Sequence, residues 1–205
     1  REELINRKKR LKTKLFEVVA DQTGKIFDPE VLTIVWARRF ADYKRPDLIT
    51  RDYKRFINLL SNTEKPVQII FFFLPYPMDY GAIHNFDNLT HISKNIKNMA
   101  VLTGHELKLS RQLKEGADVW LNNPRVTREA SGTSGMAAAM NGAVNFSTND
   151  GWVREFKDLN KTQNSFVLPI VDHNLPTHQQ DEMDLENLYE MLEKEVLPMY
   201  YDTPK

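Results

Sequence analysis

Cysteine is missing from this chain of 205 residues. Its absence excludes a disulfide scaffold, a thiolate metal site and a cysteine nucleophile. An excess of charge is missing too, because 28 lysine and arginine residues balance 28 aspartate and glutamate residues. A dedicated nucleic-acid-binding protein normally carries a basic excess, and an acidic disordered tail carries the opposite. The balance argues against both, and we expect no nucleic-acid partner.

Long hydrophobic runs are also missing. The longest uninterrupted apolar run is residues 69–74, whereas a membrane-spanning helix needs about 20 residues. Residues 1–14 are charged and lack the apolar core of a signal peptide, and the first residue is arginine rather than methionine. We therefore expect a piece of a longer cytoplasmic protein with no membrane partner. The histidines show no persuasive metal-ligand spacing, so we expect no metal site either.

Two kinds of segment alternate along the chain. Runs rich in β-branched and aromatic residues indicate strands at residues 31–37, 67–74, 99–102, 119–121 and 144–146. Because these runs are almost entirely apolar, they are typical of strands covered on both faces. Helical spacing indicates helices at residues 1–20, 47–60, 88–97, 106–115 and 182–197, and the polar stretch 158–180 is expected to be rich in loops. The alternation predicts an α/β fold with a doubly wound parallel sheet, in one Rossmann-like domain over residues 1–205.

Cations gather directly after the first expected strand, as Arg38, Arg39, Lys44 and Arg45. Ligands of open α/β sheets bind beyond the carboxyl ends of the strands. Arginine offers a bidentate fork for phosphate and lysine a point charge, so the segment is a candidate anion site. The alternative is a solvated basic turn whose charges pair with Asp42 and Asp47, which is the simpler interpretation on charge alone.

A second candidate segment covers residues 128–142. Small and hydroxyl residues precede a short alanine-rich helix, and the backbone amides of residues 132–135 are suited to cradle phosphate or sugar oxygens at the helix start. Glu129 is suited to accept hydrogen bonds from sugar hydroxyls. The alternative is an ordinary helix start in which Ser131 or Thr133 is the N-cap.

Together these segments carry a resemblance to a known family. The stretches 37–45 and 129–136, with Trp120-Leu121-Asn122-Asn123-Pro124, Asp150-Gly151-Trp152 and residues 197–202, resemble the α-glucan (glycogen, starch and maltodextrin) phosphorylases, and among them the shorter bacterial and archaeal type. The resemblance implies a GT-B arrangement, in which two Rossmann-like halves enclose the active site. This chain matches the C-terminal half, so the N-terminal half is an expected partner. The implied activity transfers glucosyl units between α-1,4-glucan and inorganic phosphate.

The resemblance also implies roles for single residues. Arg39 would hold the substrate phosphate, and Lys44 would contact the phosphate of pyridoxal phosphate (PLP), so both are expected catalytic residues. Thr133 and Ser134 would meet the same cofactor phosphate. The glucosyl hydroxyls would be bound by Glu129, Ser131 and Gly132.

Two departures from the family pattern argue against a PLP-dependent activity. The family has its Schiff-base lysine where this chain has Ala137, and alanine has no amine. The family also has a basic turn after the second strand, where residues 73–77 here contain neither lysine nor histidine. The altered turn favours a natural divergent branch over an engineered change at Ala137. Two alternatives stay open: a PLP-free branch with a sugar-nucleotide donor, and a non-catalytic glucan-binding or regulatory module.

Overall fold

The fold is a six-stranded parallel sheet with helices on both faces. We analysed it in a computed structural model that describes residues 2–39, 41–73, 75–104, 107–157 and 164–202. The strands run in the order β3-β2-β1-β4-β5-β6, and every neighbouring pair is parallel. This order is that of Rossmann-like doubly wound sheets, so the expected fold class is confirmed. The strands are β1 (Leu32–Ala37), β2 (Val67–Phe72), β3 (Met99–Leu102), β4 (Val119–Asn122), β5 (Val144–Ser147) and β6 (Ser165–Val167).

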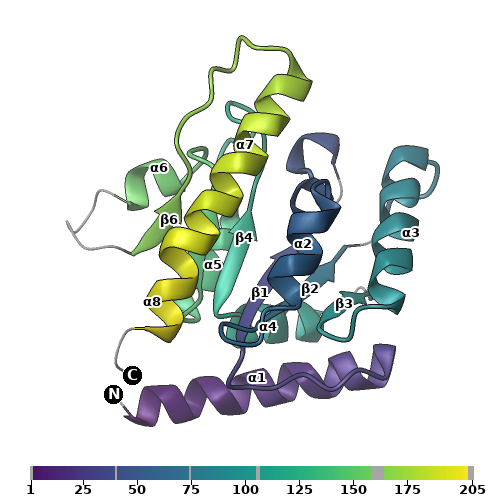
Figure 1. The fold of residues 1–205 in the computed structure, drawn as a ribbon, viewed down its shortest axis with the longest axis vertical. Coiled ribbons are helices and arrows are strands. Elements are labelled where there is room, and N and C mark those ends of the chain that lie inside the picture. Colours follow the sequence, from purple (N-terminus) through teal and green to yellow (C-terminus); the bar gives the residue numbers. More distant parts are fainter. Residues whose placement is uncertain (1, 40, 74, 105–106, 158–163, 203–205) are drawn as a thin grey trace.

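The sheet is buried on both faces because its strands are apolar on both sides. In β1, Leu32, Ile34 and Trp36 pack in one core cluster, whereas Val35 and Ala37 pack in the other. The first cluster is covered by α2 (Tyr53–Leu60), α3 (Tyr80–Lys94) and α7 (Thr177–Met191). The second is covered by α1 (Glu2–Thr23), α4 (Leu107–Gly116) and α5 (Thr133–Met140). Figure 1 shows α2, α3 and α7 on the near face of the sheet and α1 along its lower edge.

Two helices, α2 and α3, begin elsewhere than the sequence predicts, and an aspartate side chain caps each of them. The segment expected at 88–97 is α3, which ends at Lys94 and starts after Asp79, whose carboxylate accepts a hydrogen bond from the Ala82 backbone N at 3.0 Å. The helix expected at 47–60 is divided into a 3₁₀ turn (Leu48–Thr50) and α2. The segment expected at 106–115 is α4 (Leu107–Gly116), whose first residue, Leu107, is 89% exposed.

The polar stretch 158–180 was expected to be a loop, and this prediction is wrong in part. It contains β6, which pairs with β5, and the beginning of α7. Three residues are too few to show an apolar run, so the strand left no signal in the pattern. Residues 158–163 lie outside the described residues.

The chain ends in an almost continuous helical segment. The helix expected at 182–197 begins five residues earlier, at Thr177, and continues through a π-helical turn (Leu192–Val196) into α8 (Leu197–Tyr201). Pro198 does not end it, because proline is tolerated in the first turn of a helix. Among the described residues, no helix is both long and apolar enough to cross a membrane.

Candidate functional site

The two candidate segments leave the sheet at neighbouring strands. The chain order of the sheet reverses between β1 and β4, which are paired, and ligands of such sheets bind outside the carboxyl ends of the strands at this point. Residues 38–45 follow β1 and residues 123–132 follow β4. The backbone N of Arg125 donates a hydrogen bond to the carbonyl of Tyr43 at 2.8 Å, so the two segments are in contact.

Arg38 and Glu129 form a buried ion pair at this edge. The Nη2 of Arg38 lies 2.7 Å from the Oε2 of Glu129, and the two side chains are 3% and 10% exposed. The Nη1 of Arg38 is buried without a hydrogen-bond partner among the described residues. An unsatisfied buried donor is unfavourable, so this atom is suited to an acceptor from a ligand.

Lys44 belongs to the same group of charges. Burial lowers the pKa of its ammonium, and Arg38 and Arg39 lower it further, whereas Glu129 acts in the opposite direction. Arg39 itself is exposed. The structure therefore brings these three cations together with two carboxylates, Glu129 and Asp150. The cations outnumber the carboxylates by one, so the local charge is positive.

The alternative of a solvated basic turn is wrong. Arg38, Lys44 and Arg45 are buried. The two acidic residues proposed as their partners pair elsewhere, since Asp42 contacts Arg125 at 2.6 Å and Asp47 contacts Arg51 at 2.8 Å. Burial of three cations needs local compensation, which a solvated turn would not require.

The start of α5 lies beside Glu129. The N-cap of α5 is Gly132 at φ 87°, and no side chain caps the helix, so the predicted capping by Ser131 or Thr133 is wrong. Glycine is suited to this backbone because a Cβ is strained at positive φ. A Cβ at Gly132 would lie 3.5 Å from the Cγ of Glu129. Thr133 and Ser134 are the first residues of α5, where backbone N–H groups lack helical partners.

Ala137 lies one turn further along α5. It is four residues after Thr133, so the two residues share a face of the helix. Its half-buried methyl group supplies no amine at this place.

The stretch 150–152 holds the loop that contains Glu129. The Oδ2 of Asp150 accepts a hydrogen bond from the Glu129 backbone N at 2.9 Å. The backbone N of Trp152 donates to the carbonyl of Ser131, also at 2.9 Å. Gly151 permits this approach, because a Cβ there would lie 2.4 Å from the same carbonyl oxygen.

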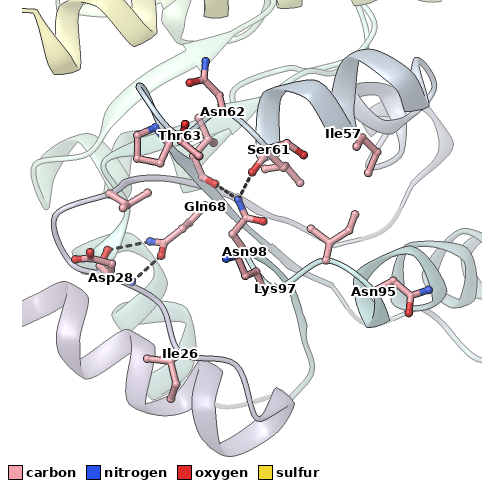
Figure 2. Close-up of a pocket in the computed structure, with 15 residues that line it drawn as sticks. Ile26, Asp28, Ile57, Ser61, Asn62, Thr63, Gln68, Asn95, Lys97 and Asn98 are labelled. Carbon is pink, nitrogen blue, oxygen red and sulfur yellow. Dashed lines mark hydrogen bonds between the residues drawn. The ribbon is translucent and has the colours of Figure 1, made fainter.

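A pocket of about 860 Å³ lies at the opposite edge of the sheet, near the amino ends of β2 and β3. Figure 2 shows that its central amides are engaged by neighbouring groups. Gln68 Nε2 donates to the Asp28 carbonyl at 3.0 Å, and Asn98 Nδ2 donates to the carbonyls of Leu60 and Val67 at 2.8 and 2.6 Å. None of the residues predicted for the site lines this pocket. Among the described residues, no cluster of three or more histidine and carboxylate side chains is arranged to hold a metal ion.

Sequence reasoning gave no separate role to Arg38 and missed Asp181 and Asp184, which bind Arg45. Arg38 follows a buried strand directly, and this position was a usable signal for its role. The two aspartates had no signal, because they lie far from Arg45 in the sequence. The altered turn after β2 includes Leu74, which lies outside the described residues. Phe40, in the first candidate segment, also lies outside them.

A family model described as carbohydrate phosphorylase matches residues 1–199. The chain belongs to the carbohydrate phosphorylase family. The resemblance inferred from the motifs is confirmed. Two relatives are a maltodextrin phosphorylase of Thermococcus litoralis, 38% identical over 85% of this chain and 21% of the relative, and a glycogen phosphorylase of Aquifex aeolicus, 36% identical over 87% and 25%. An uncharacterized protein of Methanocaldococcus jannaschii is 50% identical over 73% of this chain and 28% of its own length.

This member of the carbohydrate phosphorylase family spans only 21–28% of the length of these relatives. The match nevertheless includes both candidate segments, since it extends from residue 1 to residue 199.

Proposed function

We propose that this chain forms the phosphate- and glucosyl-binding half of an α-glucan phosphorylase site. Arg39 and Lys44, with Arg38, hold phosphate. Glu129, Ser131 and Gly132 bind the glucosyl hydroxyls. The names of the relatives from Thermococcus litoralis and Aquifex aeolicus support glucan as the substrate class. The second Rossmann-like half of a GT-B enzyme would close the cleft over these residues.

One observation carries this proposal. The buried pair of Arg38 and Glu129 leaves Arg38 Nη1 without a partner beside the further cations Lys44 and Arg39. A local excess of cations beside an unsatisfied buried donor suits an anion with several acceptor oxygens. The carboxylate in the same group suits the hydroxyls of a sugar, so one place has chemistry for both reactants.

The reaction of such a site divides into a bond exchange and a proton transfer. The bond between the glucosyl C1 and the glucan oxygen breaks, and a bond forms between C1 and an oxygen of hydrogen phosphate. The proton of hydrogen phosphate passes to the departing glucan oxygen, so atoms and charge balance. Arg39 and Lys44 hold the phosphate beside C1, where its negative charge stabilises the positive charge that develops on that carbon. Glu129 fixes the sugar through its hydroxyls.

The residues present fit the phosphate group of PLP but not its covalent attachment. Lys44, Thr133 and Ser134 would hold that phosphate. Ala137 has no amine to form a Schiff base. When bound, the group would supply its phosphate as an acid or base.

Ala137 favours a second candidate, a PLP-free transferase that uses a nucleotide sugar or another phosphorylated sugar. The same cations would then hold a diphosphate. The non-catalytic glucan-binding or regulatory module is supported by the same residue, together with the altered turn. Activity assays of the full-length parent distinguish the three candidates. Release of glucose 1-phosphate from maltoheptaose and phosphate supports a phosphorylase. Turnover of a nucleotide sugar without that release supports the second candidate. The absence of both supports the module.

The anion site can be tested on this chain by calorimetry with inorganic phosphate. We expect Arg39→Ala to weaken binding by about tenfold, since a charge-assisted hydrogen bond is lost. Arg111→Ala is the matched control, because its side chain is 77% exposed and pairs with Glu115 on α4. Equal phosphate affinity in the two variants would contradict the role of Arg39.

A further inference from the structure

Arg45 is completely buried and is held from several sides. Its side chain is 0% exposed. Its Nη1 donates to Asp181 at 2.9 Å and its Nη2 to Asp184 at 2.7 Å. The same guanidinium donates to the carbonyls of Asn123 and Pro124 at 3.0 and 3.1 Å. Arg45 therefore joins the segment after β1 to the segment after β4 and to α7.

Asp181 is shared by three arginines. Besides Arg45, it accepts a hydrogen bond from Arg51 at 2.7 Å, and it accepts two from Arg125 at 2.9 and 2.8 Å. We call Arg45, Arg51, Arg125, Asp181 and Asp184 the arginine clasp. The clasp connects both segments of the site to α7, which runs along the near face of the sheet in Figure 1.

The backbone at Arg45 explains why a clasp is needed. Arg45 adopts φ 48° and ψ 62°, in the left-handed region that residues with a Cβ rarely occupy. Such a conformation persists only where surrounding contacts hold it. Asn123 holds the backbone as well, since its Nδ2 donates to the Arg45 carbonyl at 2.9 Å.

Lys44 and Arg45 are consecutive but interact with different groups. Lys44 is close enough to Arg38, Arg39 and Glu129 to interact with their charges, whereas Arg45 contacts the aspartates of α7. The left-handed backbone at Arg45 thus sets the direction of the Lys44 side chain relative to that of Arg45.

We propose that the arginine clasp positions Lys44 in the anion site, and that Asp181 on α7 is its central positioning residue. The inference rests on the proposed function in one respect, that Lys44 helps to bind an anion. Loss of the Asp181 charge would remove the carboxylate that the three arginines share. Arg51 would keep Asp47 and Arg125 would keep Asp42, whereas Arg45 would keep only Asp184. Loss of one of its two carboxylates would loosen the buried Arg45, and with it the orientation of Lys44.

The test compares Asp181→Asn with Glu186→Gln. Both variants remove one carboxylate charge from α7, but Glu186 pairs with Arg55 at the surface and its side chain is 62% exposed. Calorimetry with inorganic phosphate and an NMR titration of the Lys44 ammonium are the two measurements. We expect Asp181→Asn to lower phosphate affinity about tenfold, as small misplacements of a binding group do. We also expect the Lys44 pKa to rise toward the ordinary lysine value, and Glu186→Gln to change neither quantity.

Further variants separate positioning from folding. Asp181→Glu keeps the charge, so we expect it to restore part of the phosphate affinity. If Asp181→Asn does not fold, Asp184→Asn removes one contact of Arg45 and is expected to shift both measurements in the same direction. A folded Asp181→Asn or Asp184→Asn protein with unchanged phosphate affinity and an unchanged Lys44 pKa overturns the proposal. If the unaltered chain binds no phosphate, the anion site fails, whereas the Lys44 pKa still tests the clasp.

Discussion

Arg38 and Glu129 are far apart in the sequence, and their charged groups lie 2.7 Å apart in the fold. Arg38 continues β1, since its backbone N donates to the Phe72 carbonyl at 3.2 Å, and Glu129 lies in the loop before α5. The pair couples the part of the site that suits phosphate to the part that suits sugar hydroxyls. Removal of either charge therefore leaves the charge of the other residue without its partner.

Arg38→Gln should destabilise the fold by about 3 kcal/mol, because it leaves the carboxylate of Glu129 buried without its partner. Urea unfolding measures this loss. Arg111→Gln breaks an exposed pair with Glu115 on α4 and should change the stability very little, because solvent screens such a pair. The double variant Arg38→Gln/Glu129→Gln should recover much of the stability. Similar losses for the Arg38 and Arg111 variants would show that the buried pair is not needed.

Ala137→Lys should give the chain a covalent attachment point for PLP. A lysine there would lie on the same face of α5 as Thr133. After incubation with PLP and reduction with borohydride, peptide mass spectrometry should find the adduct at position 137 of the variant. Ala139→Lys is the control, since residue 139 is two positions along the helix and points away from that face. Equal labelling of positions 137 and 139 would contradict the assignment of this face to the site.

Gly135→Ala should destabilise the protein by about 1–3 kcal/mol through overpacking. A Cβ at this position would lie 2.6 Å from Asn145 Oδ1 and 2.9 Å from Trp152 Nε1. Gly81→Ala is the matched change in α3, where the nearest atom would be 3.6 Å away. That variant should be neutral or more stable by about 0.5–1 kcal/mol, because alanine favours the helix. Thermal unfolding distinguishes the two, and a harmless Gly135→Ala would mean that Asn145 and Trp152 move aside easily.

The clasp should make stability depend on pH in acid. Burial alone would raise the pKa of Asp181, but hydrogen bonds from Arg125, Arg51 and Arg45 outweigh it and hold the pKa at about 2. An unfolded aspartate titrates near about 3.9. The stabilisation from Asp181 is therefore complete above about pH 4 and is lost as the pH falls toward 2.

Urea midpoints measured from pH 5 to pH 2 test this dependence. Asp181→Asn should flatten the decline of the midpoint in that window. Burial raises the pKa of Asp184 despite Arg45, so protonation of Asp184 acts in the opposite sense, and Asp184→Asn should steepen the decline. The same slope in Asp181→Asn and the unaltered protein would exclude Asp181 as the responsible group.

The core strands could be predicted from the sequence because their signal is local. Residues 31–37 and 67–74 are apolar throughout, and they became β1 and β2 with small changes at their ends. β6 could not be predicted, since three residues give too short a pattern and the strand is defined by its pairing with β5. A hydroxyl N-cap was one of two interpretations of the start of α5, whereas its N-cap is Gly132 in a left-handed conformation that depends on the loop packed around it.

The sequence by itself determined the doubly wound fold, the family resemblance and the segments of the candidate site. It also determined the missing amine at Ala137. These follow from residue type and from spacing along the chain. Only the tertiary structure decided that Arg38 pairs with Glu129 and that Arg45 is held by Asp181. The physical reason is that burial requires each charge to find a partner, and which partner is within reach depends on how the strands and helices are arranged in space.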